Sequence, residues 1–497
     1  MERGNDLVNR AELPDDPEAL KSIILEQYEQ LQDLKRQIEQ LRRAQFGRSS
    51  ERFVPPPSQL SLFGATSYPA ELPPKPPPPE PRAKAPGHGR AKLPPHLKRE
   101  KVVHDVSPEQ KRCGCGKERR QIGTETAEQL EYTPANLKVL VHERPKYACS
   151  SCADAVVTAE PKTGPIAKGL PGPGLLAYVT VSKYADHLPL YRLEGIFERQ
   201  GVQISRSTMA DWIGQVEEMV GPIIDAMRKD LLESGVIQAD DTPVPVQGGT
   251  ESGTREGRLA VYRGDEAHPQ VVFDYTPDKR NEHVVRFLNG YARWLQVDAY
   301  SGYDRLFRET KAVEVGCWAH ARRRFYDAQG SEPAAVTALG MIRELYRVEE
   351  EAKDLEERHR RRQERSKPIL ADLRGWLESE GLKALPKSGL GDAVGYSMNQ
   401  WGALIRYVED PRLAIDNNAA ERELRAVAVG RKNWLFAGSD EGGRRAAAMY
   451  SLVATCRRIG LEPFGYLRDL LTKLPDHPPD RMAELMPTRM KPLANTL

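Results

Sequence analysis

The chain has 497 residues and a formal net charge of +2, from 73 Lys and Arg against 71 Asp and Glu. This length predicts two to four domains, and the near-neutral balance excludes a uniformly basic nucleic-acid-binding protein, so any such surface must be local. The sequence has no apolar run that could span a membrane and no signal-peptide core at its N-terminus. Six cysteines are too few for a disulfide scaffold in a chain of this length, which predicts a cytoplasmic protein with reduced thiols.

Residues 15–53 are predicted to form a coiled-coil helix. Apolar residues recur there at heptad spacing, with charged and amide side chains elsewhere, at Leu20, Ile24, Leu31, Leu34, Ile38 and Leu41. The pattern favours self-association into a homo-oligomer. The alternative is a single amphipathic helix that packs on its own domain.

Residues 54–100 are predicted to be an extended linker. The segment is dense in proline, as in "KPPPPEPR", and proline fixes φ and lacks the backbone N–H. Its second half, "RAKAPGHGRAKLPPHLKRE", is basic, and it either contacts phosphates or is simply solvated.

Residues 101–160 are predicted to form a zinc ribbon-like module. Cys113 and Cys115 form a C-x-C pair, and Cys149 and Cys152 form a C-x-x-C pair. Four thiolates in two close pairs suit one tetrahedral Zn²⁺ ion. The intervening "EYTPANLKVLVHERPKYAC" is rich in β-forming residues, so a strand should deliver the second pair.

Residues 170–230 are predicted to be helical. "LYRLEGIFERQG" followed by "VQISRSTMADWIGQVEEMV" has the outline of a helix-turn-helix, with Ser205 or Ser207 as the cap of the second helix. Any two packed helices with a glycine turn share this outline, so contact with DNA is one of two open interpretations.

Residues 235–440 contain the most informative pattern. Three predicted strands (235–241, 258–264 and 270–276) precede a helix (281–291), a strand (293–300), a short helix, a strand (312–318) and a further helix. A charged helical insertion follows at about 333–410. Three meandering strands followed by alternating α and β elements predict a mixed sheet, in the order of the ribonuclease H-like fold. Residues 441–497 are predicted to be a C-terminal helical segment.

Acidic residues end two of these strands. In a sheet of this order the first and fourth strands are neighbours, so Asp240 and Asp298 should face one crevice, which a later helix carrying Glu421 can complete. Three crowded carboxylates repel each other unless divalent cations occupy the site, and two Mg²⁺ ions about 4 Å apart suit phosphodiester chemistry. Asp241 is a competing first ligand, because strand alternation places it on the opposite face without telling which face is the crevice.

The string "IDNNAAERELR" (415–425) permits two interpretations of Glu421. If Asn418 is the N-cap, Glu421 is the third helical residue and completes a capping box. Alternatively, Glu421 is a metal ligand beside a DNA-binding surface. His320, three residues after Cys317, suggests a metal pair, but two ligands are too few, and a structural or DNA-facing role is the better hypothesis for it. Cys317 and Cys456 are expected in the core.

Basic residues cluster at a few places. The runs Arg322-Arg323-Arg324 and "RHRRRQER" (358–365) stand out, and the helix of Glu421 carries further cations. The residues predicted to contact DNA are Arg322, Arg323, Arg422, Arg425, Arg431 and Lys432. The alternative is an ordinary solvated helix face.

Six stretches together resemble the insertion-sequence sixty-six family of bacterial transposases, and the resemblance covers nearly the whole chain. They are "FGRSSERF", the cysteine pairs with "RPKYAC", "ADDTPVPV", "VDAYSGYD", "GCWAHARRRF" and "DNNAAERELRAVAVGRKNWLFAGSDEGG". The resemblance implies the large DDE subunit, with Asp240, Asp298 and Glu421 as the catalytic triad. The family commonly has Asp-Glu-Thr where this chain has Asp240-Asp241-Thr242.

The activity implied is DNA transposition with Mg²⁺ or Mn²⁺ as cofactor, beside the zinc of the cysteine module. Water attacks the phosphodiester at the element's end, and the freed 3′-OH then attacks target DNA. The expected partners are transposon-end and target double-stranded DNA, a second copy of the chain, and small accessory proteins of the same element, in a cytoplasmic, nucleoid-associated setting. A transposase-derived DNA-binding regulator without catalysis is the alternative, and a nuclease acting on RNA or on junctions is a second one.

Overall fold

The computed structural model describes residues 93, 95, 97–133, 136–150, 156–160, 164–166, 169–248, 253–330, 332–385 and 388–490. The chain divides into two units, residues 1–89 and 90–497, and the second unit is described here. The predicted coiled coil at 15–53 and most of the linker at 54–100 lie outside the described residues. None of the helices in the described ranges combines the length and apolar character of a membrane span.

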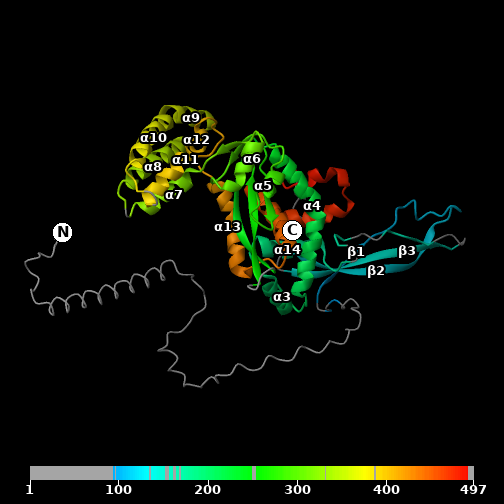
Figure 1. Ribbon diagram of the computed structural model, residues 1–497. Coiled ribbons are helices and arrows are strands. Elements are labelled where there is room, and N and C mark those ends of the chain that lie inside the picture. Colours follow the sequence, from blue (N-terminus) through cyan, green and yellow to red (C-terminus); the bar gives the residue numbers. More distant parts are fainter. Residues whose placement is uncertain are drawn as a thin grey trace, which may run out of the picture. The chain divides into compact units, whose positions relative to one another are not determined.

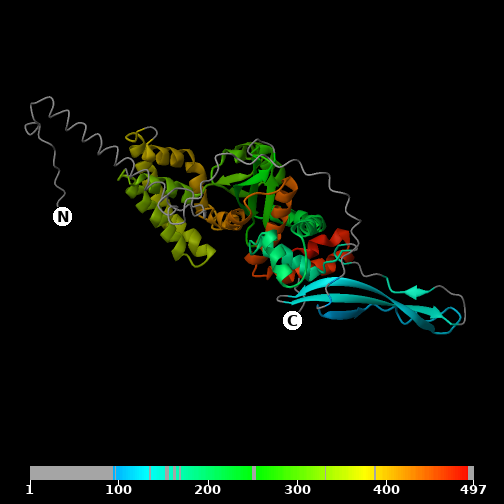
Figure 2. The same cartoon turned by 90° about the horizontal axis from the view of Figure 1, so that it is seen from below.

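The first sheet is built around a long hairpin. Its strands are β1 (Arg99–Val103), β2 (Arg119–Thr133), β3 (Asn136–Cys149) and β4 (Val157–Thr158). β3 pairs antiparallel with β2 and parallel with β1, and Figure 2 shows these three strands running together as an extended arm. The strand predicted to deliver the second cysteine pair is therefore confirmed, because β3 ends at Cys149.

The turn end of this hairpin packs on helices. The Leu130 N–H donates to the Leu170 carbonyl at 2.9 Å, and the Tyr132 ring stacks on Tyr178 with centroids 3.9 Å apart. The Glu131 carboxylate accepts from the Leu175 N–H at 3.1 Å, in the first turn of α2 (Pro173–Tyr184). Burial raises the pKa of Glu131, since the contact withdraws its carboxylate from water.

The second sheet has five strands in the order β7-β6-β5-β8-β9. These strands are β5 (Val236–Gln247), β6 (Thr254–Arg263), β7 (Val271–Thr276), β8 (Trp294–Gln296) and β9 (Val313–Val315). β5, β6 and β7 pair antiparallel, whereas β5, β8 and β9 pair parallel. The mixed sheet and the adjacency of its first and fourth strands are as predicted.

Several strand lengths differ from the prediction: β6 is longer than the predicted 258–264 and β9 is shorter than the predicted 312–318, and the differences in β5 and β8 bear on the site. β5 continues to Gln247 through Pro243 and Pro245, because β8 pairs only with its first three residues and leaves the rest of that side free of a ladder. β8 stops at Gln296 instead of reaching residue 300, and Ala299 takes a positive φ of 67° at the bend that follows.

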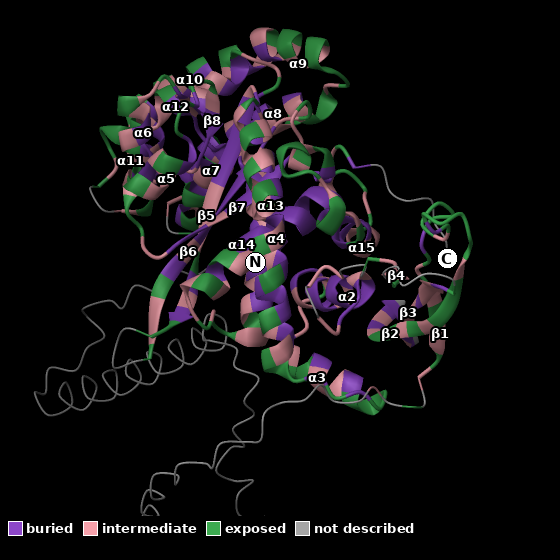
Figure 3. Cartoon of the chain, turned by 90° about the vertical axis from the view of Figure 1, so that its right-hand side faces the viewer, coloured by how far each residue is buried: buried purple, intermediate pink, exposed green. Residues whose placement is uncertain are grey.

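Helices cover the second sheet. The helical region before it contains α3 (Leu190–Arg199) and α4 (Arg206–Leu232), and Ser205 caps α4 by accepting from the Thr208 N–H at 3.1 Å, as predicted. The segments after the strands contribute α5 (Asn281–Phe287), α6 (Asp304–Glu309), α7 (Trp318–Ala328), α13 (Asn418–Trp434), α14 (Asp440–Arg458) and α15 (Pro463–Lys473). Figure 3 shows buried residues on β5 and β7 and on the helix faces beside them.

α14 also completes the open edge of the sheet. The Ser451 and Thr455 hydroxyls accept from the N–H groups of Phe273 and Val271, on β7, at 2.8 and 2.9 Å. Such side-chain bonds satisfy backbone donors that an edge strand would otherwise expose. The C-terminal segment expected at 441–497 and the helices at 170–230 therefore pack into the same core as the sheet.

The predicted insertion is helical and has a core of its own. It contains α8 (Ala335–Glu351), α9 (Leu355–Arg361), a π-helical turn (Arg362–Ser366), α10 (Lys367–Gly381), α11 (Gly389–Asn399) and α12 (Trp401–Ile405), which gather with α7 in Figure 1. Short 3₁₀ helices lie at Ser301–Tyr303, Arg406–Val408, Leu474–Asp476 and Pro479–Leu485.

One arginine in a basic run of the insertion is internal. The Arg362 side chain is fully buried and donates to both carboxylate oxygens of Glu349, at 2.8 and 2.6 Å, and to backbone carbonyls. "RHRRRQER" had been a candidate nucleic-acid surface, and for Arg362 that interpretation is wrong. A buried arginine needs this full set of acceptors because an unpaired charge in the core is strongly destabilising.

Candidate active site

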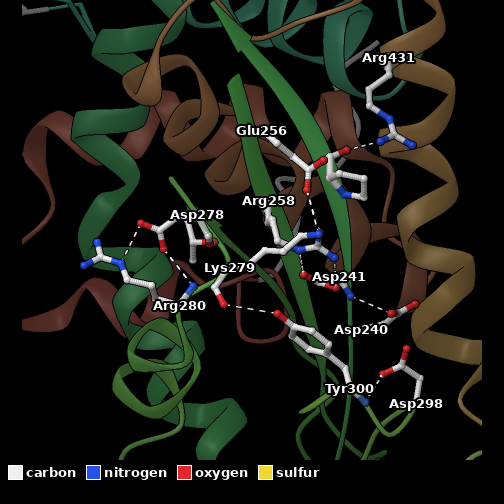
Figure 4. A network of polar contacts seen from close by, with 12 residues as sticks. Asp240, Asp241, Glu256, Arg258, Asp278, Lys279, Arg280, Asp298, Tyr300 and Arg431 are labelled. Atoms are coloured by element: carbon white, nitrogen blue, oxygen red, sulfur yellow. Dashed lines mark hydrogen bonds and ion pairs between the residues drawn. The ribbon is translucent and has the colours of Figure 1, made fainter. Parts of the chain in front are cut away.

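Asp240 and Asp298 come from two neighbouring parallel strands, one from within its strand and the other from just after its strand. Asp240 is within β5, and Asp298 lies two residues beyond the end of β8. Figure 4 shows their carboxylates close together beside the helix that carries Arg431. The Tyr300 N–H donates to Asp298 at 3.2 Å, which fixes the bend after the strand.

The carboxyl group of Asp240 is in a setting that disfavours its charge. Burial is the main cause, and the carboxylates of Asp298, Glu421 and Asp241 add repulsion, whereas the Asp241 N–H lowers the pKa. Together they raise the pKa of Asp240 to about 7. Hard carboxylate oxygens crowded in this way are the donor set that a divalent cation such as Mg²⁺ prefers, so these residues fit the expected ion.

Asp241 points away from this group of acids. Its two oxygens accept from the Arg258 guanidinium on β6, one of them at 2.6 Å, and both side chains are mostly buried. Figure 4 shows the pair on the other side of β5 from the Asp240 carboxylate. The side chain of Asp241 is thus committed to an ion pair, which favours Asp240 of the two candidates.

Glu421 lies in the first turn of α13, and the capping-box interpretation of it is wrong. The N-cap is Asn417 rather than Asn418, so Glu421 is the fourth helical residue, and Asp416 accepts from the Asn418 N–H at 3.1 Å instead. The Asn417 side chain makes no cap bond, because it is fully buried and donates to the Ala239 carbonyl on β5 at 2.8 Å. That bond joins the start of α13 to the residue before Asp240.

Two buried glutamines, which sequence reasoning missed, hold the same elements together. Gln238 on β5 donates to Gln296 on β8 at 2.9 Å, and Gln296 donates to the Ala414 carbonyl, just before α13, at 2.7 Å. Each glutamine precedes one of the two candidate aspartates by two residues, as Gln-Ala-Asp and Gln-Val-Asp. An amide inside an apolar strand, repeated at the same spacing before two acids, was the available signal.

His320 is a neighbour of Glu421. Its Nδ1 lies 3.7 Å from Glu421 Oε1, and both atoms are buried without a hydrogen-bond partner in the described part of the chain. Cys317 Sγ lies within 4.8 Å of both groups, yet it is fully buried and accepts from the Asn417 N–H at 3.2 Å. The expected core position of Cys317 is confirmed, and His320 borders the carboxylate group.

The predicted DNA-contacting residues fall on two helices. Arg322 and Arg323 are exposed on α7, and Arg422, Arg425 and Lys432 are exposed on α13. Arg431 differs from them, because it is half-buried and donates to the Pro243 carbonyl on β5. Arg324 of the same run lies over the Tyr396 ring, 4.3 Å from its centroid.

Three of the four predicted zinc ligands converge. The sulfur atoms of Cys113, Cys115 and Cys149 lie within 4.8 Å of one another, and those of Cys115 and Cys149 are 3.7 Å apart. A tight turn presents the first pair, in which the Cys113 N–H donates to the Lys117 carbonyl at 2.9 Å. Cys152 lies outside the described residues. Three converging thiols, two of them buried, fit a zinc ion.

Comparison with known sequences gives matches along most of the chain. Residues 168–445 match the profile described as "Transposase IS66 family", and residues 451–488 match "IS66 C-terminal element". Residues 110–153 match "zinc-finger binding domain of transposase IS66", and residues 33–102 match "Transposase C of IS166 homeodomain".

Relatives of similar length come from Sinorhizobium fredii (strain NBRC 101917 / NGR234). "Uncharacterized protein y4hP" is 33% identical over 428 residues, which cover 81% of this chain and 77% of the relative. "Uncharacterized protein y4qI" is 36% identical over 411 residues, which cover 79% of this chain and 76% of the relative.

Proposed function

Because the chain belongs to the IS66 family of transposases, we propose that it cleaves DNA at the ends of its own insertion sequence and joins the freed 3′-OH to target DNA. The five-stranded sheet and its helices then form a ribonuclease H-like catalytic core, from 235 to 440, with the helical insertion between its last strand and α13. The zinc module, the helical region at 170–230 and the N-terminal coiled coil serve DNA binding and self-association.

The observation that carries this proposal is the grouping of three carboxylates from three separate elements. Beside burial, the charges of Asp298 and Glu421 raise the pKa of Asp240, and one buried oxygen of Glu421 accepts no hydrogen bond from the residues that the structure describes. Unpartnered buried acceptors are costly, so their retention supports a bound ion as the missing partner.

We assign Asp240, Asp298 and Glu421 the role of holding the catalytic metals. Two Mg²⁺ or Mn²⁺ ions in such a site activate the attacking oxygen and stabilise the leaving oxygen of a phosphodiester. Gln238, Gln296 and Asn417 fix the spacing of the three carboxylates. Arg322, Arg323, Arg422, Arg425 and Lys432 bind the phosphates on either side of the scissile one.

The other partners follow from the remaining modules. Cys113, Cys115, Cys149 and Cys152 hold Zn²⁺, and the arm that carries three of them binds the element's end. Residues 15–53 pair with a second copy of the chain, so that two ends are held together. Accessory proteins encoded by the same element complete the assembly.

The test is a cleavage and joining assay with the full-length protein. A labelled duplex carrying the element's end, incubated with Mg²⁺, should acquire a nick at that end and then appear joined to a second duplex. The Asp240→Asn variant is the matched control, because it keeps the shape of the side chain and removes one ligand charge. DNA binding without any nick in the wild type would instead identify a DNA-binding regulator.

A further inference from the structure

A cavity of about 250 Å³ lies beside α13, away from the carboxylates. The C-terminal end of α13, the first turns of α14, the strands β5 and β6, and the helices α2, α3 and α4 all contribute to it. Its inner wall is apolar, with Val244, Leu259 and Ile213, and three cations line it, namely Lys183, Arg431 and Arg445. The cavity thus combines an apolar interior with concentrated positive charge.

Lys183 is unusual among these cations because its ammonium group lies against an aromatic ring instead of a carboxylate. Its Nζ lies 4.4 Å from the centroid of the Trp434 ring, and among the residues that the structure describes no carboxylate forms an ion pair with it. Burial lowers the pKa of Lys183 to about 8. A cation–π contact offsets only part of the cost of desolvating an ammonium group, so an anion in the cavity would stabilise it.

Two glycines inside helices hold the other groups in place. A β-carbon at Gly430 would collide with the Trp434 ring, and one at Gly214 would lie 2.7 Å from the Arg445 guanidinium carbon. Glycine inside a helix costs about 1 kcal/mol relative to alanine. The missing β-carbons let the indole and the guanidinium approach the two helices closely at the cavity wall.

The cavity and the candidate catalytic carboxylates lie along the same two elements, β5 and α13. Val244 and Asp240 are four residues apart on the same face of β5, about 13 Å along the strand. Arg431 and Glu421 are ten residues apart on α13, about 15 Å along the helix. Either span corresponds to about four nucleotide steps at roughly 3.4 Å each.

We propose that this cavity receives one unpaired nucleotide of the DNA end, a few steps from the scissile phosphate. The base enters the apolar interior beside Trp434, and its phosphate binds Lys183, Arg431 and Arg445. The charges favour a nucleic acid over an apolar peptide, because three cations and no carboxylate are among the lining residues. Of the acids nearby, Asp440 binds Arg255 and the Tyr275 hydroxyl, Glu441 binds Arg444 at 2.6 Å, and Glu217 lies near Arg445. This inference rests on the proposed function, since it takes DNA as the substrate.

The test is a binding measurement that needs no catalysis. Fluorescence anisotropy with the full-length protein, without added Mg²⁺, compares a blunt duplex with the same duplex carrying a short single-stranded 3′ overhang. The wild type should bind the overhang duplex about tenfold more tightly, which is the usual contribution of one captured base. Trp434→Ala and Lys183→Met should lose this preference and keep their affinity for the blunt duplex within about twofold.

Arg444→Met is the matched control for Arg445→Met. Both residues are on α14, but Arg444 pairs with Glu441 outside the cavity, so only Arg445→Met should reduce the overhang preference. Circular dichroism checks that each variant is folded, and Trp434→Phe should recover part of the preference. Equal affinity of the wild type for both duplexes, or a preference that survives in Trp434→Ala and Lys183→Met, would overturn the proposal.

The two proposals fail in different ways. Asp240→Asn should abolish the nick and leave the overhang preference intact. If Asp240→Asn cleaves like the wild type, the catalytic assignment is wrong while the cavity proposal stands on its own measurement.

Discussion

Asp240 and Asp241 are adjacent in the sequence, yet the fold stabilises the charge of Asp241 and disfavours the charge of Asp240. Asp241 is neutralised by Arg258, whereas Asp240 is partly buried near other acids, and its pKa is raised to about 7. Strand alternation predicted opposite faces, but it could not tell which face held the acids. The deciding residue, Arg258, is on the next strand, and only the pairing register brings it to Asp241.

Asp240→Asn should stabilise the metal-free protein at neutral pH. Because the folded pKa is above the unfolded value, ionisation favours unfolding, and the penalty grows as the pH rises from about 4 to about 7. The variant should therefore gain up to about 4 kcal/mol over the wild type above pH 7 and little near pH 4. Urea unfolding in a chelator of divalent ions at several pH values measures this difference.

Asp241→Asn is the opposite case. It leaves Arg258 without its anion in a mostly buried position, so the free energy of unfolding should fall by about 1 to 3 kcal/mol at pH 7. If Asp241→Asn stabilises the protein and Asp240→Asn does not, then Asp241 is the metal ligand and Asp240 is the residue with the structural role.

Glu421→Gln should leave the helix intact and abolish cleavage. Glu421 is outside the capping position, so its amide analogue costs α13 only the small favourable interaction of a first-turn carboxylate with the helix dipole, while the site loses a charged ligand. The expected result is an unchanged affinity for DNA with no detectable nick. Nicking near the wild-type rate would mean that another acid completes the site. The sequence predicted Glu421 as a candidate but placed the N-cap one residue late, because the burial of Asn417 against β5 is a tertiary contact.

At the scale of elements, the sequence pattern predicts the order of the strands in the sheet, but it does not predict the lengths of the strands. The order of strands and helices is visible in the alternation of apolar residues and turns. The length of β5 is not, because its two prolines normally end a strand, and they are tolerated only since β8 is short. Strand ends near the acids depend on which neighbour is present, and a single strand's sequence does not carry that information.

The buried amide pair connects three elements, so its loss should act on geometry. Gln296→Leu removes the bond to the Ala414 carbonyl and leaves the Gln238 amide with only the Asp416 carbonyl, at 3.3 Å, as acceptor. We expect cleavage to fall at least about tenfold and the Mg²⁺ concentration for half-maximal activity to rise, because misplaced ligands bind metal less tightly. Affinity for DNA should be unchanged.

Circular dichroism and a Mg²⁺ titration of cleavage distinguish this effect from simple unfolding. A variant that remains folded and keeps the wild-type Mg²⁺ dependence would show that the amide pair is not needed for positioning. Ser397→Ala, a buried polar change on α11 in the insertion, is the control, because its hydroxyl bonds only within its own helix.

The cysteine module should depend on metal by itself. Cys113→Ser should release about one equivalent of zinc and unfold the end of the β2–β3 hairpin, since about 10 kcal/mol of metal binding is folding energy for so small a unit. The core should keep its unfolding transition. Elemental analysis of the wild type that finds no zinc would contradict the assignment, and Cys456→Ser, in α14, is the cysteine control.

For the whole molecule, the near-neutral net charge does not show that some basic residues are buried and others are exposed. Arg362 stabilises the insertion from inside, whereas Arg422 and Arg425 are exposed next to Glu421. A run of arginines in the sequence does not reveal this division, because burial depends on partners such as Glu349 that lie in another helix.

Arg422→Gln with Arg425→Gln should weaken binding to all DNA sequences about equally. Each lost phosphate contact should lower the slope of log affinity against log salt by about one unit. Arg360→Gln, an exposed arginine of α9 that pairs with Glu364 at 2.8 Å, should leave the slope unchanged. Equal slopes for the wild type and the double variant would place the DNA on another surface.

The β2–β3 hairpin has a consequence for spacing along DNA. Its turn end packs on α2, and its cysteine end is twelve residues farther along β3, from Leu137 to Cys149, which is about 40 Å of strand. Forty ångströms correspond to about twelve base pairs, slightly more than one turn of B-DNA. A rigid arm of this length would fix the distance along the DNA between the arm's contact and the cleavage point. Each base pair inserted between these two DNA positions lengthens the DNA and also rotates one position about the helix axis relative to the other. Ends of the element should therefore tolerate a full helical turn of added DNA better than half a turn.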